Sequence, residues 1–296
     1  MELDQQVHVL QQFVDQSVQG TGTGMAPLTI LCDQAIDRLH EDADAVVCLG
    51  ATPYESDFPT RHGLHTSRIA MAIGLEMGLG REQLMDLGMG CMIHDLGMHK
   101  TGVSQFETKG KITDRHRRLL ADHPVHSVEI AGQYGDEISE RAQMVAYQIH
   151  ERIDGSGYPR GFGRDQIHSL AKIAGVAETF VDLLAPRPNR VGFQGYYVVA
   201  HLLDQMKAGK FEPPVIRALL QATSLYPIGS CVELSNGKVG RVIRTGAQQF
   251  DRPTVEIWDR RDLESNPDII NLRVDTGVSI TAPIPSMQAA PQHQKA

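Results

Sequence analysis

The 296-residue chain lacks the cysteine pairs, long apolar runs and signal sequence that would identify a disulfide-rich, membrane or secreted protein. Its four cysteines (Cys32, Cys48, Cys91, Cys231) are scattered and form no CxxC pair, which is typical of reduced thiols in a cytoplasmic protein. No apolar run approaches the roughly 20 residues of a membrane span. The N-terminus MELDQQVHVL has no basic region followed by an apolar stretch, so we expect neither a membrane anchor nor a secretory signal.

Positive charge is also scarce. Lys and Arg total 28 against 36 for Asp and Glu, a net charge of −8. Because affinity for polymeric nucleic acid depends on positive charge, that class of ligand is excluded, whereas a small anion held by a few arginines is not. Histidine is abundant instead: nine of the 13 fall between His62 and His168.

The apolar pattern predicts a mainly α chain that ends in a small β unit. Helical spacing covers 57–79, 81–95, 167–185, 194–207 and 213–223, with a further helix around 138–149 and a Gly/Pro-rich loop over 154–163. Thr113 is a candidate N-cap, and Pro124 should interrupt or restart the helix that follows. Asn236-Gly237 predicts a hairpin, followed by strands at TVEIW and VSITAPI. We expect an N-terminal helical region (1–56), a helical bundle (57–224), a β extension (225–283) and a disordered tail (284–296).

Histidines and acids recur at a regular spacing through the bundle. Each interval is 27 to 29 residues long: His65 to His94, Asp95 to His123, His123 to His150, and His150 to Glu178. Such an interval is about 40 Å of helix, or one helix out and one back, so each residue would return to the same level of a bundle. This pattern favours one metal site built from several helices. The candidate ligands are His65, His94, Asp95, His123, His150 and Glu178.

Each member also has an ordinary interpretation, and the ligand types decide between metals. A single histidine on a helix is usually a half-buried one, and Glu178, which lies among small apolar residues, could instead pair with Lys172 or Arg187. Four imidazoles and two carboxylates disfavour structural zinc and suit two divalent iron or manganese ions. Asp95 is the natural bridge between two ions, which is an arrangement that hydrolyses phosphodiesters.

These residues resemble a known family. His65, the doublet His94-Asp95 in MIHDLG, His123-Pro124, and His150-Glu151 followed by DGSGYP over 154–159 are similar to the HD-GYP branch of the HD-domain phosphohydrolases, over residues 60–224. The stretch AETFVDLLAPRPNR resembles the one in which a metal-binding acid precedes a phosphate-contacting arginine segment.

The resemblance implies a fold and an activity. The fold is an HD-type helical bundle, and the activity is metal-dependent hydrolysis of cyclic di-GMP to linear pGpG, or further to GMP. Asp95 would be catalytic, and Arg187, Arg190 and Tyr158 would bind substrate. The loop around Tyr158 would also be a docking surface for a GGDEF-type or other signalling protein, and a homodimer is an open alternative.

Departures from the family leave a second function open. Ile149 occupies a position where the family has a further histidine, and Glu178 occupies a position where the family has Asp. Met98 replaces a family lysine that is a candidate for protonating the leaving group. Arg61 lies where some members have an acidic residue. Lys100 is the nearest replacement for the lysine, and His62 could substitute as a ligand, although a surface histidine is the simpler interpretation. The alternative function is a catalytically impaired protein that binds cyclic di-GMP or a partner. The complete GSGYP segment disfavours a hydrolase for another nucleotide.

Overall fold

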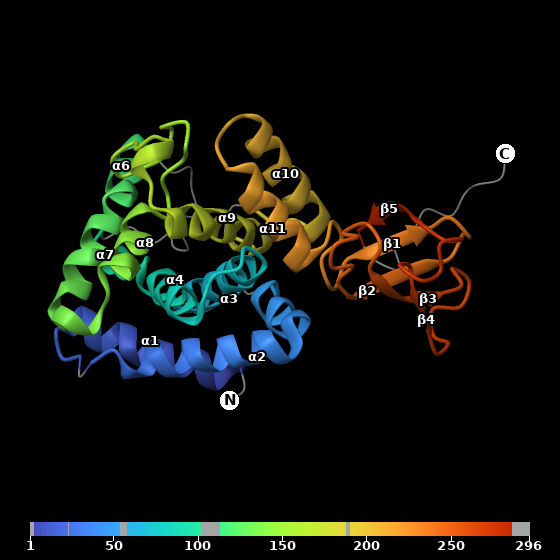
Figure 1. The fold of residues 1–296 in the computed structure, drawn as a ribbon, viewed down its shortest axis with the longest axis horizontal. Helices are drawn as coiled ribbons and strands as arrows, with labels where there is room; N and C mark the ends of the chain where they lie inside the picture. Colours follow the sequence, from blue (N-terminus) through green and yellow to red (C-terminus); the bar gives the residue numbers. More distant parts are fainter. Residues whose placement is uncertain (1–2, 23, 54–57, 102–112, 188–189, 286–296) are drawn as a thin grey trace.

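The computed structural model describes residues 3–22, 24–53, 58–101, 113–187 and 190–285. Within them a helical body is followed by a small antiparallel sheet (Figure 1), which confirms the predicted fold class. The α-helices are α1 (Leu3–Gln19), α2 (Ala26–Gly50), α3 (Thr60–Glu76), α4 (Arg81–Ile93), α5 (Met98–Thr101), α6 (Asp114–Ala121), α7 (His123–Ala131), α8 (Glu140–Gln148), α9 (Ser169–Leu184), α10 (Gly195–Lys207) and α11 (Pro213–Thr223), with 3₁₀ turns at Gly132–Glu137 and Arg164–Gln166.

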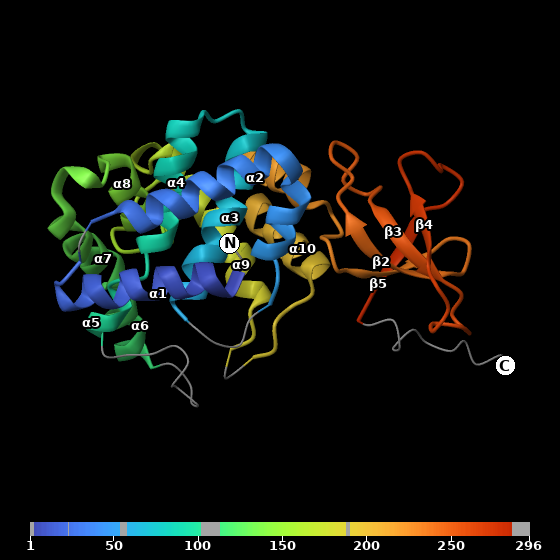
Figure 2. The same cartoon turned by 90° about the horizontal axis from the view of Figure 1, so that it is seen from below.

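Helix α3 lies at the centre of the helical body. It is buried from Thr60 to Gly74 with the exception of Arg61, and it packs against α2, α4, α9 and α11. A helix buried on all sides belongs to a core and not to a surface. Helices α1 and α2 cover one side of this core, in front of α3 in Figure 2, and Leu28 and Leu64 share one apolar cluster. The boundaries placed at 56 and 224 stay a prediction.

Local sequence signals place the helix ends near the site. Thr113 caps α6, because its Oγ1 accepts from the His116 N–H at 3.2 Å. Helix α6 ends at Ala121 and α7 begins at His123, with Pro124 in its first turn, where a missing N–H costs nothing. The restart predicted at Pro124 is therefore confirmed, and it places His123 at the start of a helix.

The β extension is a sheet of order β4-β3-β2-β1-β5, all antiparallel. Its strands are β1 (Cys231–Leu234), β2 (Val239–Arg244), β3 (Thr254–Trp258), β4 (Asp268–Asn271) and β5 (Ile280–Ile284). The hairpin at Asn236-Gly237 is confirmed, and Gly237 has φ +81°. The short edge strand β4 was not predicted, because DIIN is four residues long and mostly exposed.

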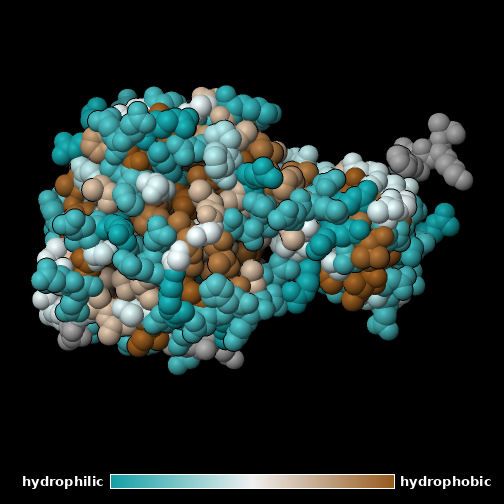
Figure 3. Space-filling model, in the orientation of Figure 1, coloured by the Kyte–Doolittle hydropathy of each residue, from teal (hydrophilic) through white to brown (hydrophobic). Residues whose placement is uncertain are grey.

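The sheet is attached to the helical body through charged contacts. Arg244 on β2 donates from both terminal nitrogens to the two Asp42 carboxylate oxygens at 3.0 Å, at the non-helical residue inside α2. The view in Figure 3 shows mostly hydrophilic side chains on one face, with apolar ones near the middle of the helical body and on the β extension. Among the described helices, none combines the length and apolar character that crossing a bilayer requires. Beyond Pro285 the predicted tail lies outside the described residues.

Candidate metal centre

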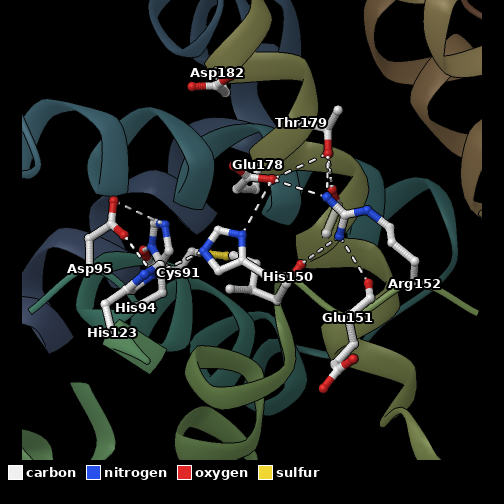
Figure 4. Close-up of polar contacts among 12 residues, drawn as sticks. Cys91, His94, Asp95, His123, His150, Glu151, Arg152, Glu178, Thr179 and Asp182 are labelled. Carbon is white, nitrogen blue, oxygen red and sulfur yellow. Dashed lines mark hydrogen bonds and ion pairs between the residues drawn. The ribbon is translucent and has the colours of Figure 1, made fainter. Parts of the chain in front are cut away.

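The ends of three helices and the segment after a fourth converge on one pocket. The side chains come from the first turn of α3 (His62), the end of α4 (His94 and Asp95), the first residue of α7 (His123) and the segment after α8 (His150). Figure 4 shows His94, Asp95, His123 and His150 close together. The pocket has a volume of about 200 Å³. Its lining residues are Phe58, His62, Asp95, His123, His150, Tyr158, Glu178, Asp182 and Arg187.

Asp95 belongs to two overlapping groups of ligand atoms. One group is His62, His94 and Asp95, the other is Asp95, His123 and His150, and within each group the ligand atoms lie within 4.8 Å of one another. Asp95 Oδ2 lies 3.3 Å from His94 Nε2, and Oδ1 lies 3.2 Å from His123 Nε2. The expected meeting of His94, Asp95, His123 and His150 therefore occurs in the structure, with Asp95 between the two groups.

Backbone contacts fix the orientation of two of the imidazoles. His94 Nδ1 donates to the Cys91 carbonyl at 2.7 Å, and His123 Nδ1 donates to the Leu120 carbonyl at 2.6 Å. With the Nδ1 proton engaged, each ring presents the lone pair of Nε2 to the pocket, as metal-binding histidines do. Within the described part of the chain, the buried Nε2 of His94 has no hydrogen-bond partner.

Burial sets the protonation states in the pocket. It lowers the pKa of His62 to about 3 and lowers the pKa values of His94 and His150. Burial by itself would raise the pKa of Asp95, but the neighbouring His94 and His123 hold it well below its usual range. Neutral imidazoles beside an ionised carboxylate are the forms that bind a cation.

The donor set therefore fits divalent transition-metal ions. It consists of imidazole nitrogens and one shared carboxylate, and His123 Nε2 lies only 3.1 Å from His150 Nε2. Cys91 contacts the cluster through its carbonyl, which accepts from His94 Nδ1. The residues present therefore fit a metal centre around Asp95.

His62, and not His65, reaches this cluster. The two residues are three positions apart on α3, so their Cα atoms differ by about 4.5 Å along the helix axis. His62 is 2% exposed and lies in the pocket wall, which corrects the expectation of a surface histidine. His65 is fully buried one turn deeper, where burial and the nearby Arg68 and Arg61 lower its pKa to about 3. The sequence prediction of His65 as a ligand is not supported by this geometry.

Glu178 lies on the pocket wall but outside both ligand groups. Its Oε2 is 3.5 Å from Arg152 Nη2, 3.2 Å from Thr179 Oγ1 and 3.8 Å from His150 Nδ1 (Figure 4). Burial raises its pKa to about 7, although Arg152 opposes that shift. The structure thus supplies the salt bridge from Arg152 and not from the expected Lys172 or Arg187; Lys172 pairs with Glu212 at 2.9 Å.

Lys100 does not reach the pocket. Its side chain is 46% exposed, and its Nζ lies 3.6 Å from Glu129 Oε2. The structure does not bring Lys100 into the pocket lining, and its catalytic role stays a prediction that this geometry does not support. Met98 is buried beside Leu120 and Phe58, and Ile149 is fully buried in the core, as its apolar stripe predicted.

Tyr158 and Arg187 lie at the pocket, whereas Arg190 does not. The Tyr158 ring stacks on His150 with centroids 4.7 Å apart, and the Arg187 guanidinium lies 4.8 Å from the Phe58 ring centroid. Arg190 is absent from the lining and bonds to the end of α9. Asp182, which sequence reasoning missed, lines the pocket one turn after Glu178; the four-residue interval between the two acids was the available signal.

Comparison with known proteins identifies the family of this chain. The family model of the HD domain matches residues 51–215, which is more than half of the chain. The chain belongs to the HD-domain family. The HD-GYP resemblance is likewise confirmed by curated relatives.

These relatives include proteins that are named cyclic di-GMP phosphodiesterases. The protein PA4108 of Pseudomonas aeruginosa is 24% identical over 81% of this chain and 57% of its own length. The response regulator RpfG of Xanthomonas campestris pv. campestris is 29% identical over 52% of this chain and 41% of its own. The chain thus spans about half the length of these relatives.

A solved structure supports the fold. The HDG"Y"P protein Bd1817 from Bdellovibrio bacteriovorus superposes with a TM-score of 0.60 at 17% identity, over 73% of this chain and 68% of that one.

Proposed function

We propose that this HD-domain chain is a metal-dependent phosphodiesterase that opens cyclic di-GMP to linear pGpG. The observation that carries the proposal is the position of Asp95 between two ligand groups, within a pocket that also holds an arginine. Two ions so placed supply an activated water and neutralise charge on the phosphate. The relatives named cyclic di-GMP phosphodiesterases support the choice of substrate.

The residues that line the pocket have separate roles in this proposed reaction. Asp95 and the four imidazoles of His62, His94, His123 and His150 would hold the cations, and Arg187 would bind a non-bridging phosphate oxygen with its planar guanidinium. Tyr158 contributes an aromatic face next to His150. The loop over 154–163 also exposes residues 154–156 and 160–161, which are available to a signalling protein such as a GGDEF-type cyclase.

A second function is favoured by one observation. Met98, at the family's lysine position, is packed with Leu120 and Phe58, and the described pocket lining contains no lysine. Loss of a general acid costs about 10²–10⁴-fold in rate. A protein with this lining could bind cyclic di-GMP without efficient turnover and act as a receptor.

Incubation with cyclic di-GMP and Mn²⁺ or Fe²⁺, with products separated by chromatography, tests both functions. Formation of pGpG or GMP supports the phosphodiesterase, and binding measured by calorimetry without product supports the receptor. Neither turnover nor binding would reject cyclic di-GMP as the ligand. Cyclic GMP–AMP in a parallel incubation measures base specificity. We place this reaction in the cytoplasm, in keeping with four cysteines of which none forms a disulfide.

A further inference from the structure

Arg190 contacts the protein at the place where it was expected to contact substrate. Its Nη2 donates to the Asp182 backbone carbonyl at 2.6 Å and to Asp182 Oδ2 at 2.7 Å. Its Nη1 donates to the carbonyls of Leu183 and Ala185, both at 3.2 Å. These carbonyls lie at the C-terminal end of α9, where helical carbonyls lack partners and a cation is favoured.

The same Asp182 carboxylate holds Arg187. Asp182 Oδ1 accepts from Arg187 Nε at 3.1 Å and also from its Nη2. The two arginines are further joined through their backbones, since Arg187 N–H donates to the Arg190 carbonyl at 2.8 Å and the reverse bond is 3.0 Å. One carboxylate on α9 therefore fixes both guanidinium groups.

The chain after Arg190 returns tightly onto the end of α9. The Phe193 N–H donates to the Leu183 carbonyl at 2.9 Å. A Cβ added at Gly192 would lie 2.2 Å from the Leu184 carbonyl oxygen, so only glycine permits this approach. Arg190 and the residues that follow it are thus packed against the end of α9.

We propose that Arg190 and Asp182 are positioning residues that hold Arg187 at the metal pocket, and that Arg187 is the arginine of the pair that contacts the phosphate. This inference rests on the proposed phosphodiesterase function. A guanidinium that is already held in place loses little conformational entropy when substrate binds. Its attraction for the phosphate therefore increases the affinity for substrate without a large ordering cost. Loss of Arg190 would weaken substrate binding only through Arg187.

A double-mutant cycle tests this dependence. KM is measured for bis(4-nitrophenyl) phosphate and for cyclic di-GMP with wild type, Arg187→Ala, Arg190→Ala and the double variant. Loss of a charged hydrogen bond to phosphate raises KM about tenfold. We expect both single variants to raise KM, and the double variant to match Arg187→Ala within about twofold. If the two effects multiply, Arg190 contacts the phosphate directly and the inference is wrong.

Arg190→Lys supplies an independent readout. A lysine keeps the positive charge, so a direct phosphate contact predicts a KM close to that of wild type. Its three donors cannot reproduce the four bonds that Arg190 makes in a fixed fork, so the positioning role predicts a raised KM. Thermal unfolding of each variant verifies that it is folded, and bound metal is measured to show that the centre is intact.

Failure of the inference and failure of the proposed function give different results. Wild type that cleaves bis(4-nitrophenyl) phosphate but leaves cyclic di-GMP intact contradicts the proposed substrate. In that case the KM cycle on the small diester still decides whether Arg190 acts through Arg187. Turnover of cyclic di-GMP with multiplicative arginine effects contradicts the inference alone.

Discussion

The His62 ring lies opposite the His94 ring, with centroids 5.4 Å apart and planes inclined at 57°. This contact makes the first turn of α3 part of the candidate metal centre. His62→Ala removes one of the two imidazoles from the group that contains His94 and Asp95. We expect the bound metal to fall from about two ions per chain to about one, because the group of Asp95, His123 and His150 is left complete. Elemental analysis of the purified protein measures this change.

His65→Ala is the matched control on the same helix. His65 is fully buried but lies outside both ligand groups, so the metal content should stay at the wild-type value. Stability should fall by about 1–3 kcal/mol, because a buried ring is removed. Loss of metal from His65→Ala together with full occupancy in His62→Ala would reverse the assignment made here.

Asp95→Asn should remove metal and activity together. Asp95 is the residue shared by both ligand groups, and an amide supplies neither the negative charge nor two equivalent oxygens. We expect both ions to be lost and the rate to fall by at least about a hundredfold. Metal content and phosphodiesterase rate are measured on the same preparation, and full activity in this variant would show that the site lies elsewhere.

Glu178→Gln should keep the metal content of wild type. The Glu178 carboxylate is 3.5 Å from Arg152 Nη2, and glutamine has the same size without the charge. We expect the free energy of unfolding at pH 7 to change by less than about 1 kcal/mol, because burial raises the pKa of Glu178 to about 7 and the folded protein therefore gains little from the ionised carboxylate. Urea denaturation measures the stability. An ion missing from this variant would instead identify Glu178 as a ligand, as the sequence predicted.

The sequence carried enough information to predict the helical fold and the convergence of His94, Asp95, His123 and His150. These residues lie at helix ends, and the helix ends are marked by local signals such as Thr113 and Pro124. Interval lengths of about 28 residues then constrain where each helix end returns.

The choice between His62 and His65 could not be made in the same way. Both lie near the start of one helix, and both fit the interval to His94 within one turn. What decides between them is the packing of α3 against α4, which is a tertiary property. The direction of Lys100 depends likewise on the contacts of α5, a helix of only four residues.

Lys100→Ala should leave the activity within about twofold of wild type, because surface substitutions away from a site have small effects. The Lys100 ammonium is on the surface beside Glu129 and does not line the pocket. The initial rate with cyclic di-GMP is the measurement. A drop of tenfold or more with unchanged metal content would mean that α5 reorients to bring this lysine to the substrate.

Gly157→Ala should damage both the fold and the site, because the chain passes very close to itself there. A Cβ at Gly157 would lie 2.4 Å from the Arg152 backbone nitrogen and 2.5 Å from the His150 carbonyl oxygen. Since those atoms belong to the backbone that carries His150, the loop must move away and take Tyr158 with it. We expect a loss of about 1–3 kcal/mol of stability and a clear fall in rate.

Gly163→Ala is the control in the same loop. Its φ of −83° suits any residue, and the nearest atom to an added Cβ is Gln166 Oε1 at 3.9 Å. Stability and rate should both stay near the wild-type values, as measured by thermal unfolding and by turnover of cyclic di-GMP. Equal damage from the two substitutions would indicate that the whole loop is intolerant of side chains, and that the close approach at Gly157 is not the cause.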